Sequence, residues 1–292
     1  MKYDLIIIGA GPGGLTAAIY AKRANMNVLI IEKGAPGGQM INTYSVENYP
    51  GFENISGADL AINMFNQVMS MNIECVFESV VNIKEGFVVT TNDNTYESKN
   101  IIIATGQRPK GLNLDNEEKL IGRGISYCAI CDGSFYKKKD VIIVGGGNSA
   151  IEEALYLSKI CNSVFVLVRN QMRASKSSID ALEKQNNVTI YLKEEVKEYL
   201  VSDNKFIGVN TNKRQILASG LFLYVGNIPQ TEFLSNFDIL DENGYIKTNE
   251  FMETSIKGLY AVGDCRAKDL RQIITACNDG AIAANKVGKD LE

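Results

Sequence analysis

The residues best suited to chemistry are two cysteines, Cys128 and Cys131, with Asp132 directly after them. Two cysteines separated by two residues can close a small disulfide ring, and the strain in that ring favours exchange over permanence. One thiol of such a pair tends to have a lowered pKa, which makes it a nucleophile near neutral pH. Because the chain contains no histidine, a carboxylate is the natural candidate for a general acid. The segment therefore predicts dithiol–disulfide exchange with Asp132 as the acid.

The same cysteine pair could instead be half of a zinc site or an unreactive structural pair. A zinc site needs a second pair of cysteine or histidine ligands, and the other four cysteines stand singly. A static disulfide is rare in the cytosol. The missing histidine also excludes Ser-His-Asp and Cys-His catalysis and histidine metal sites, so we expect no metal. Buried packing is the simplest role for the remaining cysteines, which are Cys75, Cys161, Cys265 and Cys277.

A glycine-rich turn occurs twice, each time between a short apolar run and a helical pattern. The first copy follows Leu5–Ile8 and spans Gly9–Gly14, and the second follows Val141–Val144 and spans Gly145–Ala150. Strand, glycine turn and helix in this order are typical of the Rossmann dinucleotide-binding unit. The repeat therefore predicts an α/β fold with two Rossmann-like (three-layer) nucleotide-binding domains.

Each position in these turns has a physical reason. The first glycine lets the chain turn sharply, and the second lets the backbone approach a pyrophosphate. The third lets helix and strand pack closely, and alanine can replace it there. The helix N-terminus then offers free N–H groups and a positive dipole end to the phosphates. We predict nucleotide contacts in the two turns at Gly9, Gly11, Pro12, Gly14, Gly145, Gly147, Asn148 and Ser149.

The residue that ends the second strand of each unit indicates which nucleotide binds there. In the first unit this residue is Glu32, whose carboxylate can accept hydrogen bonds from ribose hydroxyls and would repel a 2′-phosphate. In the second unit Arg169 holds the matching position, with Arg173 close behind it. Arginines there favour a 2′-phosphate. We therefore expect FAD or NAD at the first turn and NADP at the second; ordinary surface charge is the alternative for the two arginines.

The second glycine unit lies between two polar, turn-rich segments, Lys110–Lys119 and Asp241–Gly244. One domain inserted into another is the simplest architecture that explains this order. We expect residues 1–112 and 243–292 to form the FAD-binding domain, and residues 113–242 to form an NAD(P)H-binding domain that carries the cysteine pair. A flavin supplies hydride and two-electron chemistry that side chains lack. The combination predicts electron flow from a nicotinamide through a flavin to a disulfide.

Charge and hydropathy argue against several other classes of protein. Thirty basic and 34 acidic side chains leave a net charge of −4, which disfavours non-specific binding to nucleic acid or to an anionic membrane. The apolar runs are much shorter than a membrane span, and the first residues do not have the pattern of a signal peptide. We expect a cytoplasmic protein with no nucleic-acid or membrane partner.

Nearly end to end, the chain resembles the low-molecular-weight thioredoxin reductases. The most specific matching stretch is Gly122–Gly133, which contains both cysteines. The larger pyridine-nucleotide disulfide reductases place their cysteines in the FAD domain and use a histidine, which this chain lacks. Further matching stretches are Gly9–Gly14, Gly37–Gln39, Val46–Gly51, Ala104–Gly106, Gly145–Ala150, Glu152–Ala154, Val262–Asp264 and Arg271–Gln272.

The resemblance implies a role for each matching residue. Cys131 would be the sulfur next to the flavin, Cys128 the sulfur that attacks thioredoxin, and Asp132 the acid–base group. It also implies FAD and NADPH as cofactors, thioredoxin or a similar protein as partner, a homodimer, and rotation of the inserted domain with hinges near Lys110–Asp115 and Asp241–Gly244. The residues that would line FAD are Gly9, Gly11, Pro12, Gly14, Glu32, Gly37, Gly38, Gln39, Asn48, Thr105, Gly106, Asp264, Arg271 and Gln272.

One segment departs from that family. NADPH-dependent members carry His-Arg-Arg-x-x-x-Arg after the second strand of the inserted domain, whereas Leu167–Ala174 keeps only Arg169 and Arg173. Losing one phosphate-binding arginine costs about 1.5–3 kcal/mol, or roughly ten- to hundredfold in affinity. NADPH remains the favoured donor because the second glycine turn is intact. NADH-dependent or ferredoxin-dependent reduction of thioredoxin, a dithiol oxidase that gives electrons to oxygen, and a non-enzymatic flavin-binding module are the alternatives.

Overall fold

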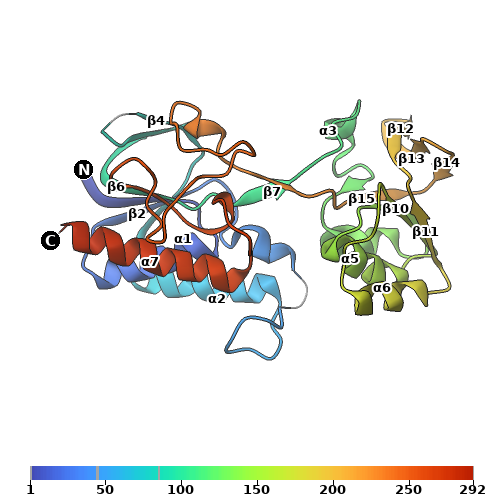
Figure 1. Cartoon of the computed structure of the whole chain (residues 1–292), viewed down its shortest axis with the longest axis horizontal. Coiled ribbons are helices and arrows are strands. Elements are labelled where there is room, and N and C mark those ends of the chain that lie inside the picture. Colours follow the sequence, from blue (N-terminus) through green and yellow to red (C-terminus); the bar gives the residue numbers. More distant parts are fainter. Residues whose placement is uncertain (1, 44–45, 85, 292) are drawn as a thin grey trace. The chain divides into compact units, whose positions relative to one another are not determined.

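A computed structural model describes residues 2–43, 46–84 and 86–291 and divides the chain into two compact units (Figure 1). Unit 1 comprises Met1–Arg108 and Ile228–Glu292, and unit 2 comprises Pro109–Asn227. Strands β7 (Gln107–Pro109) and β16 (Asn227–Pro229) pair where the chain passes from one unit to the other. Unit 2 is thus continuous in sequence, and unit 1 is made of two segments.

The second crossing between the units lies earlier in the chain than the boundary of 242/243 expected from the sequence. Residues after β16 pack on unit 1, where Leu234 and Ile239 belong to one of its hydrophobic clusters. The turn at Asp241 therefore lies within unit 1. The Asp241 side chain stabilises this turn by accepting hydrogen bonds from the backbone N–H groups of Asn243 and Tyr245 at 2.9 and 2.8 Å. The first expected linker, Lys110–Lys119, belongs to unit 2.

Unit 1 is built around a sheet with the strand order β3-β2-β1-β6-β5-β4, in which β17 also pairs with β6. Strand β5 runs antiparallel to both of its neighbours, and the other pairings among β1, β2, β3, β6 and β17 are parallel. The parallel strands carry continuous apolar runs because both faces of the sheet are covered. The strands are β1 (Lys2–Ile8), β2 (Val28–Glu32), β3 (Glu74–Phe77), β4 (Val80–Lys84), β5 (Val88–Thr91), β6 (Thr95–Ile103) and β17 (Leu259–Ala261).

Three long helices, α1 (Pro12–Arg23), α2 (Gly57–Ser70) and α7 (Ile273–Leu291), complete unit 1 with the short turns η1 (Gly38–Asn42), η3 (Glu232–Leu234) and η4 (Gly263–Cys265) (Figure 1). Helices α1 and α7 approach very closely, because a Cβ at Gly280 would lie 2.2 Å from the carbonyl oxygen of Gly13. Helix α7 begins at Ile273. Both Arg271 and Gln272 therefore precede it.

Unit 2 contains a second parallel sheet, with the strand order β11-β10-β9-β15-β8. Its elements are β8 (Ile125–Ser126), β9 (Asp140–Val144), β10 (Ser163–Val168), β11 (Val188–Leu192), β15 (Gly220–Leu223), α3 (Glu117–Leu120), α4 (Ala129–Asp132), η2 (Gly133–Tyr136), α5 (Asn148–Ser158) and α6 (Lys176–Glu183). An antiparallel sheet of β12 (Val196–Ser202), β13 (Lys205–Thr211) and β14 (Gln215–Leu217) is added to it. Two Rossmann-like α/β units were predicted from the sequence, and this prediction is confirmed.

The parallel pairings decide where the chemistry can take place. All strand ends of one direction meet at one edge of a parallel sheet, and ligands bind outside the carboxyl ends. In unit 1 the ends of β1, β6 and β17 are followed by Gly9, Ala104 and Val262, and Glu32 is the last residue of β2. In unit 2 the ends of β8, β9, β10 and β15 lie together in the same way. Each unit thus gathers its predicted site residues at one edge.

Candidate active site

The two glycine turns have the same geometry. Gly9 and Gly145 end β1 and β9 with φ angles of 107° and 149°, values that glycine adopts without steric cost. A Cβ at Gly9 would lie 2.5 Å from the carbonyl oxygen of Ala104, and a Cβ at Gly145 would lie 2.4 Å from that of Tyr224. In both turns the first glycine therefore packs directly against the residue that follows the neighbouring parallel strand, β6 in unit 1 and β15 in unit 2.

The second glycine of each turn faces open space. Gly11 and Gly147 immediately precede α1 and α5, and a Cβ at either position would meet no described atom within 4 Å. The third position is closed instead, since a Cβ at Gly14 would lie 2.0 Å from the carbonyl oxygen of Gly9. Each turn thus leaves a hollow in front of a helix N-terminus, where unpaired N–H groups favour an anion.

Glu32 closes the first turn. Its two carboxylate oxygens accept hydrogen bonds from the backbone N–H of Ala10, at 2.6 Å, and of Gly34, at 2.8 Å. The N–H of Gly37 donates to the carbonyl oxygen of Ala10 at 2.8 Å, and Gly38 lies beside Gly11. The structure therefore brings together the predicted contacts Gly9–Gly14, Glu32, Gly37 and Gly38.

Other predicted residues of unit 1 form hydrogen bonds with residues that sequence reasoning did not select, or with one another. The side-chain amide of Gln39 donates to the carbonyl oxygen of Gln107 at 3.2 Å, and the Thr105 hydroxyl donates to that of Gln230 at 2.7 Å. The amide of Asn48 donates to Gln272 at 3.0 Å, and Gly106 follows Thr105 with a φ of 63°. Gln107 and Gln230 had no signal in the sequence, because each is a single polar residue, Gln107 at the start of β7 and Gln230 directly after β16.

Asp264 and Arg271 lie near each other at the end of β17. Burial raises the pKa of Asp264 above its usual value, and the positive charges of Lys268 and Arg271 oppose that rise. The Arg271 guanidinium stacks 4.3 Å from the ring centre of Tyr245 and donates to the carbonyl oxygen of Arg266 at 3.3 Å. Its Nε is buried and has no hydrogen-bond partner among the described residues, so it is a donor available to a ligand.

A buried carboxylate on α7 fixes the turn that carries Asp264. Asp279 is only 3% exposed and accepts a hydrogen bond from the backbone N–H of Gly263 at 3.0 Å. Arg266 and Lys268 form ion pairs with it at 2.8 and 2.9 Å. Sequence reasoning missed Asp279, although a carboxylate among the small residues of a final helix does signal a buried charge that needs partners.

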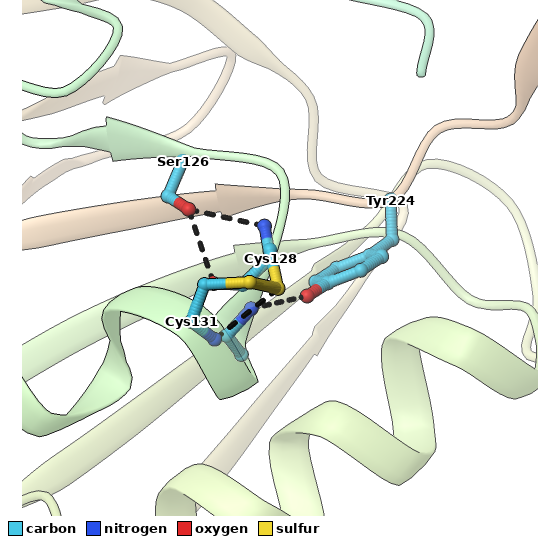
Figure 2. Close-up of a disulfide and its surroundings, with 5 residues drawn as sticks. Ser126, Cys128, Cys131 and Tyr224 are labelled. Carbon is cyan, nitrogen blue, oxygen red and sulfur yellow. Dashed lines mark hydrogen bonds between the residues drawn. A yellow bond between two sulfur atoms is a disulfide. The ribbon is translucent and has the colours of Figure 1, made fainter. Parts of the chain in front are cut away.

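In unit 2 the two cysteines form a disulfide at the carboxyl end of β8 (Figure 2). The Ser126 hydroxyl accepts a hydrogen bond from the N–H of Cys128 at 3.0 Å and donates to its carbonyl oxygen at 3.2 Å. The N–H of Cys131 donates to the Cys128 sulfur at 3.2 Å. Cys131 is exposed and Cys128 is half-buried, and the half-buried Asp132 ends the same short helix. The predicted catalytic residues therefore share one turn.

Tyr224 and Glu153 lie near each other in unit 2; the sequence did not single out Tyr224, and it contained Glu153 only as part of the matching stretch Glu152–Ala154. The Tyr224 hydroxyl accepts a hydrogen bond from the N–H of Ala129 at 2.8 Å (Figure 2). Burial raises the pKa of Tyr224, and the negative charges of Glu153 and Asp132 add to the rise. Glu153 has a buried Oε2 with no hydrogen-bond partner among the described residues. Burial, and then the charge of Glu152, raise the pKa of Glu153 to about 7.

This carboxyl group makes the stability of unit 2 depend on pH. Because its pKa is raised on folding, the protonated group contributes stability below the unfolded value of about 4.3, and that contribution is lost as the pH rises to about 7. We expect Glu153→Gln to raise the free energy of unfolding by about 1–3 kcal/mol at pH 8 and to change it little at pH 4. Urea unfolding at both pH values measures this; equal effects at the two would contradict it. The exposed Glu183 on α6 provides the control Glu183→Gln.

The predicted arginine segment folds back onto the second glycine turn. The N–H of Arg173 donates to the carbonyl oxygen of Gly146 at 2.6 Å, and the N–H of Ser175 donates to the Asn148 side chain at 3.0 Å. Both Arg169 and Arg173 are exposed. Ser149 follows Asn148 in the first turn of α5. The predicted nucleotide contacts of unit 2 thus share one edge with the disulfide.

Residues 3–280 match the pyridine nucleotide-disulphide oxidoreductase family. The chain belongs to this family. It is 43% identical to the thioredoxin reductase of Listeria monocytogenes over 99% of this chain and 94% of that protein. Its structure is similar to that of Lactococcus lactis thioredoxin reductase, with a TM-score of 0.93 and 40% identity over 99% and 98% of the two chains. A ferredoxin-flavin thioredoxin reductase from Clostridium acetobutylicum also matches, with a TM-score of 0.56 and 32% identity over 99% and 98%.

Of the remaining cysteines of this pyridine nucleotide-disulphide oxidoreductase, Cys161, Cys265 and Cys277 are buried and Cys75 is half-buried. Burial raises the pKa values of Cys75, Cys161 and Cys265 to about 11. Cys277 is buried on α7, where its thiol lies 3.9 Å from the carbonyl oxygen of Pro12 in α1. No cluster of metal-ligating side chains occurs in residues 2–43, 46–84 and 86–291. Within the same ranges, every helix is too short or too polar to cross a membrane.

Proposed function

We propose that this protein is a thioredoxin reductase that takes electrons from NADPH, passes them through FAD to the disulfide of Cys128 and Cys131, and delivers them to thioredoxin. The observation that carries the proposal is an exchangeable disulfide at the same sheet edge as a dinucleotide turn, in a chain that folds a second dinucleotide turn in another unit. The relatives with 43% and 41% identity over 99% of the chain carry that name.

The residues of unit 1 fit FAD. A Cβ at Gly11 would meet no described atom within 4 Å, so the backbone there is open to a phosphate. The carboxylate of Glu32 has lone pairs left for ribose hydroxyls. The unpartnered Nε of Arg271 is a buried donor at the same sheet edge. FAD would supply the hydride transfer that no side chain of this protein can perform. The full set proposed to hold it is Gly9, Gly11, Pro12, Gly14, Glu32, Gly37, Gly38, Gln39, Asn48, Thr105, Gly106, Asp264, Arg271 and Gln272.

Replacing Glu32 tests this fit. We expect Glu32→Ala to weaken FAD retention roughly ten- to hundredfold, because two charge-assisted hydrogen bonds to the first turn and the proposed ribose contact are lost together. Flavin absorbance per protein after gel filtration measures it. Glu32→Gln keeps one acceptor oxygen and is the graded control. Unchanged flavin content in Glu32→Ala would count against the ribose contact.

The chemistry at the disulfide follows from the turn that holds it. When two electrons enter, the S–S bond breaks and leaves one sulfur as a thiolate and the other as a thiol after uptake of a proton. Asp132 ends the same turn and is proposed to supply that proton. The Cys128 thiolate then attacks the disulfide of thioredoxin, and Cys131 resolves the mixed disulfide by displacing the reduced partner.

The contact with thioredoxin is proposed to involve Phe135. This side chain is 70% exposed and lies in η2, directly after the disulfide turn. An exposed phenyl group beside an exchangeable disulfide suits a partner with an apolar rim around its own cysteines. We expect Phe135→Ser to raise KM for thioredoxin about tenfold and to leave kcat with a small disulfide reagent unchanged. Steady-state kinetics with both substrates measures this. An equal KM for thioredoxin in Phe135→Ser and in the unmodified protein would show that Phe135 is not part of the contact.

The donor is tested by anaerobic titration of the purified protein with NADPH and, separately, with NADH, while the flavin absorbance is followed. Bleaching at low NADPH concentration supports Arg169 and Arg173 as the 2′-phosphate contacts. Bleaching mainly by NADH means that the shorter arginine segment has changed the donor. No bleaching by either, with the disulfide still reducible through photoreduced flavin, moves the donor to ferredoxin. A homodimer in the cytoplasm is part of the same proposal, and sedimentation of the flavin-loaded protein tests the dimer.

A further inference from the structure

Tyr224 connects the second glycine turn with the disulfide. It follows β15, and its N–H donates to the carbonyl oxygen of Val144 at 2.8 Å. Its own carbonyl oxygen is the atom that leaves no room for a Cβ at Gly145. Its hydroxyl accepts the hydrogen bond from Ala129 at the start of α4 (Figure 2). One residue therefore fixes both the nucleotide turn and the first N–H of the helix that carries the sulfurs.

The hydroxyl hydrogen of Tyr224 remains available for a second bond. A phenol can accept and donate at the same time, and the bond with Ala129 uses only an acceptor lone pair. The nearby Glu153 does not take this hydrogen on its Oε2, which has no hydrogen-bond partner within the described part of the chain. Burial raises the pKa of Tyr224, so the hydroxyl keeps its hydrogen at neutral and moderately alkaline pH.

Opening the disulfide creates an acceptor at this end of α4. The Cys128 sulfur already receives the N–H of Cys131 at 3.2 Å, so it lies over the same first turn as the N–H of Ala129 that the Tyr224 hydroxyl binds. As a thiolate it becomes a stronger acceptor. The ionisable side chains on the two neighbouring helices are acidic: Asp132 ends α4, Glu152 and Glu153 lie on α5, and the charges of Glu153 and Asp132 act on Tyr224. A neutral hydrogen-bond donor such as the Tyr224 hydroxyl can stabilise a thiolate beside these acidic groups. The half-buried Tyr136 on η2 is the other phenol near Asp132.

We propose that the Tyr224 hydroxyl donates a hydrogen bond to the Cys128 thiolate after reduction and so stabilises the nucleophile that attacks thioredoxin. The inference rests on the proposed function for the identity of the attacking sulfur. It makes Tyr224 part of the dithiol centre and assigns it a task separate from that of Asp132. Tyr224 stays protonated and donates a hydrogen bond, whereas Asp132 transfers a proton.

The thiol pKa of Cys128 in the reduced flavin-loaded protein tests this. The rate of alkylation by iodoacetamide is followed between pH 5 and 10, and the modified peptide is quantified by mass spectrometry. In Tyr224→Phe, which keeps the ring, we expect the midpoint for Cys128 to rise by about one pH unit, or about tenfold less thiolate near neutral pH. In Tyr136→Phe, which removes a hydroxyl from the neighbouring turn, we expect no shift.

A midpoint that is unchanged or lower in Tyr224→Phe overturns the proposal, because the freed N–H of Ala129 would then serve the thiolate as well as the hydroxyl does. If Tyr224→Phe does not fold, Tyr224→Met fills much of the same volume without a donor and is measured in the same way. Neither measurement uses NADPH or thioredoxin. Failure of the proposed function, seen as no turnover with thioredoxin in the unmodified protein, is therefore distinguished from failure of this inference.

Discussion

Replacing Cys128 with serine is expected to reduce thioredoxin reduction to background while the donor still reduces the bound flavin. The disulfide cannot form in this variant, and serine at the attacking position offers no thiolate to the partner. The glycine turns and Glu32 are untouched, so both dinucleotide sites keep their contacts. Anaerobic stopped-flow of the flavin band measures the first half-reaction, and reduction of insulin through thioredoxin measures the complete cycle.

The matched control for this variant is Cys161→Ala, which removes a buried thiol from the core of the same unit. We expect it to retain both half-reactions. Loss of flavin reduction in Cys128→Ser would contradict the assigned roles, since it would mean that the disulfide is needed before electrons reach the flavin.

Replacing Asp279 with alanine is expected to lower the free energy of unfolding of unit 1 by about 3–5 kcal/mol, the cost of breaking a buried ion pair. Arg266 and Lys268, whose side chains are each 11% exposed, lose their shared counter-charge, and the N–H of Gly263 loses its acceptor. Because that turn carries Asp264, FAD retention should fall as well. Urea unfolding and flavin content after gel filtration measure the two effects.

Two further variants separate burial from charge in this prediction. Asp279→Asn keeps an acceptor for Gly263 and should lie between the native protein and Asp279→Ala. Glu232→Gln breaks the exposed pair of Arg108 and Glu232, whose side chains are 51% and 65% exposed, and should change the free energy of unfolding by less than about 1 kcal/mol. Similar losses in Glu232→Gln and Asp279→Ala would contradict the importance given to burial.

The fold and half of the site were predictable because their signals are local. The apolar runs before Gly9 and Gly145, the glycines themselves and the spacing of the cysteines are all read within about 20 residues, the scale of one strand–turn–helix unit. The chain's parallel pairing then gathers these segments at two sheet edges without any further information. The hydrogen bond from Gly37 to Ala10 in the first turn also forms next to the end of β2.

The rest of the site depends on contacts between residues far apart in the sequence. Tyr224 meets Ala129, and Asp279 meets Gly263, only after the sheets have formed. A tyrosine after an apolar strand or an aspartate in a helix has many possible partners, so its type alone does not identify one. The expected boundary at 242/243 was misplaced for a related reason: the Asp241 turn is polar like a linker, yet Ile239 and Ile246 on either side of it are core residues.

The four cysteines outside the disulfide also affect how the protein reacts with electrophiles. Three of these thiols have pKa values of about 11, and the fourth is buried on α7 beside α1. At the pH of a cell they are therefore slow to alkylate, and the oxidised enzyme presents no other thiol. Reactive sulfur appears only while the disulfide is open. A thiol-directed inhibitor or heavy metal would consequently inactivate the working enzyme and spare the resting one, and covalent labelling would report turnover.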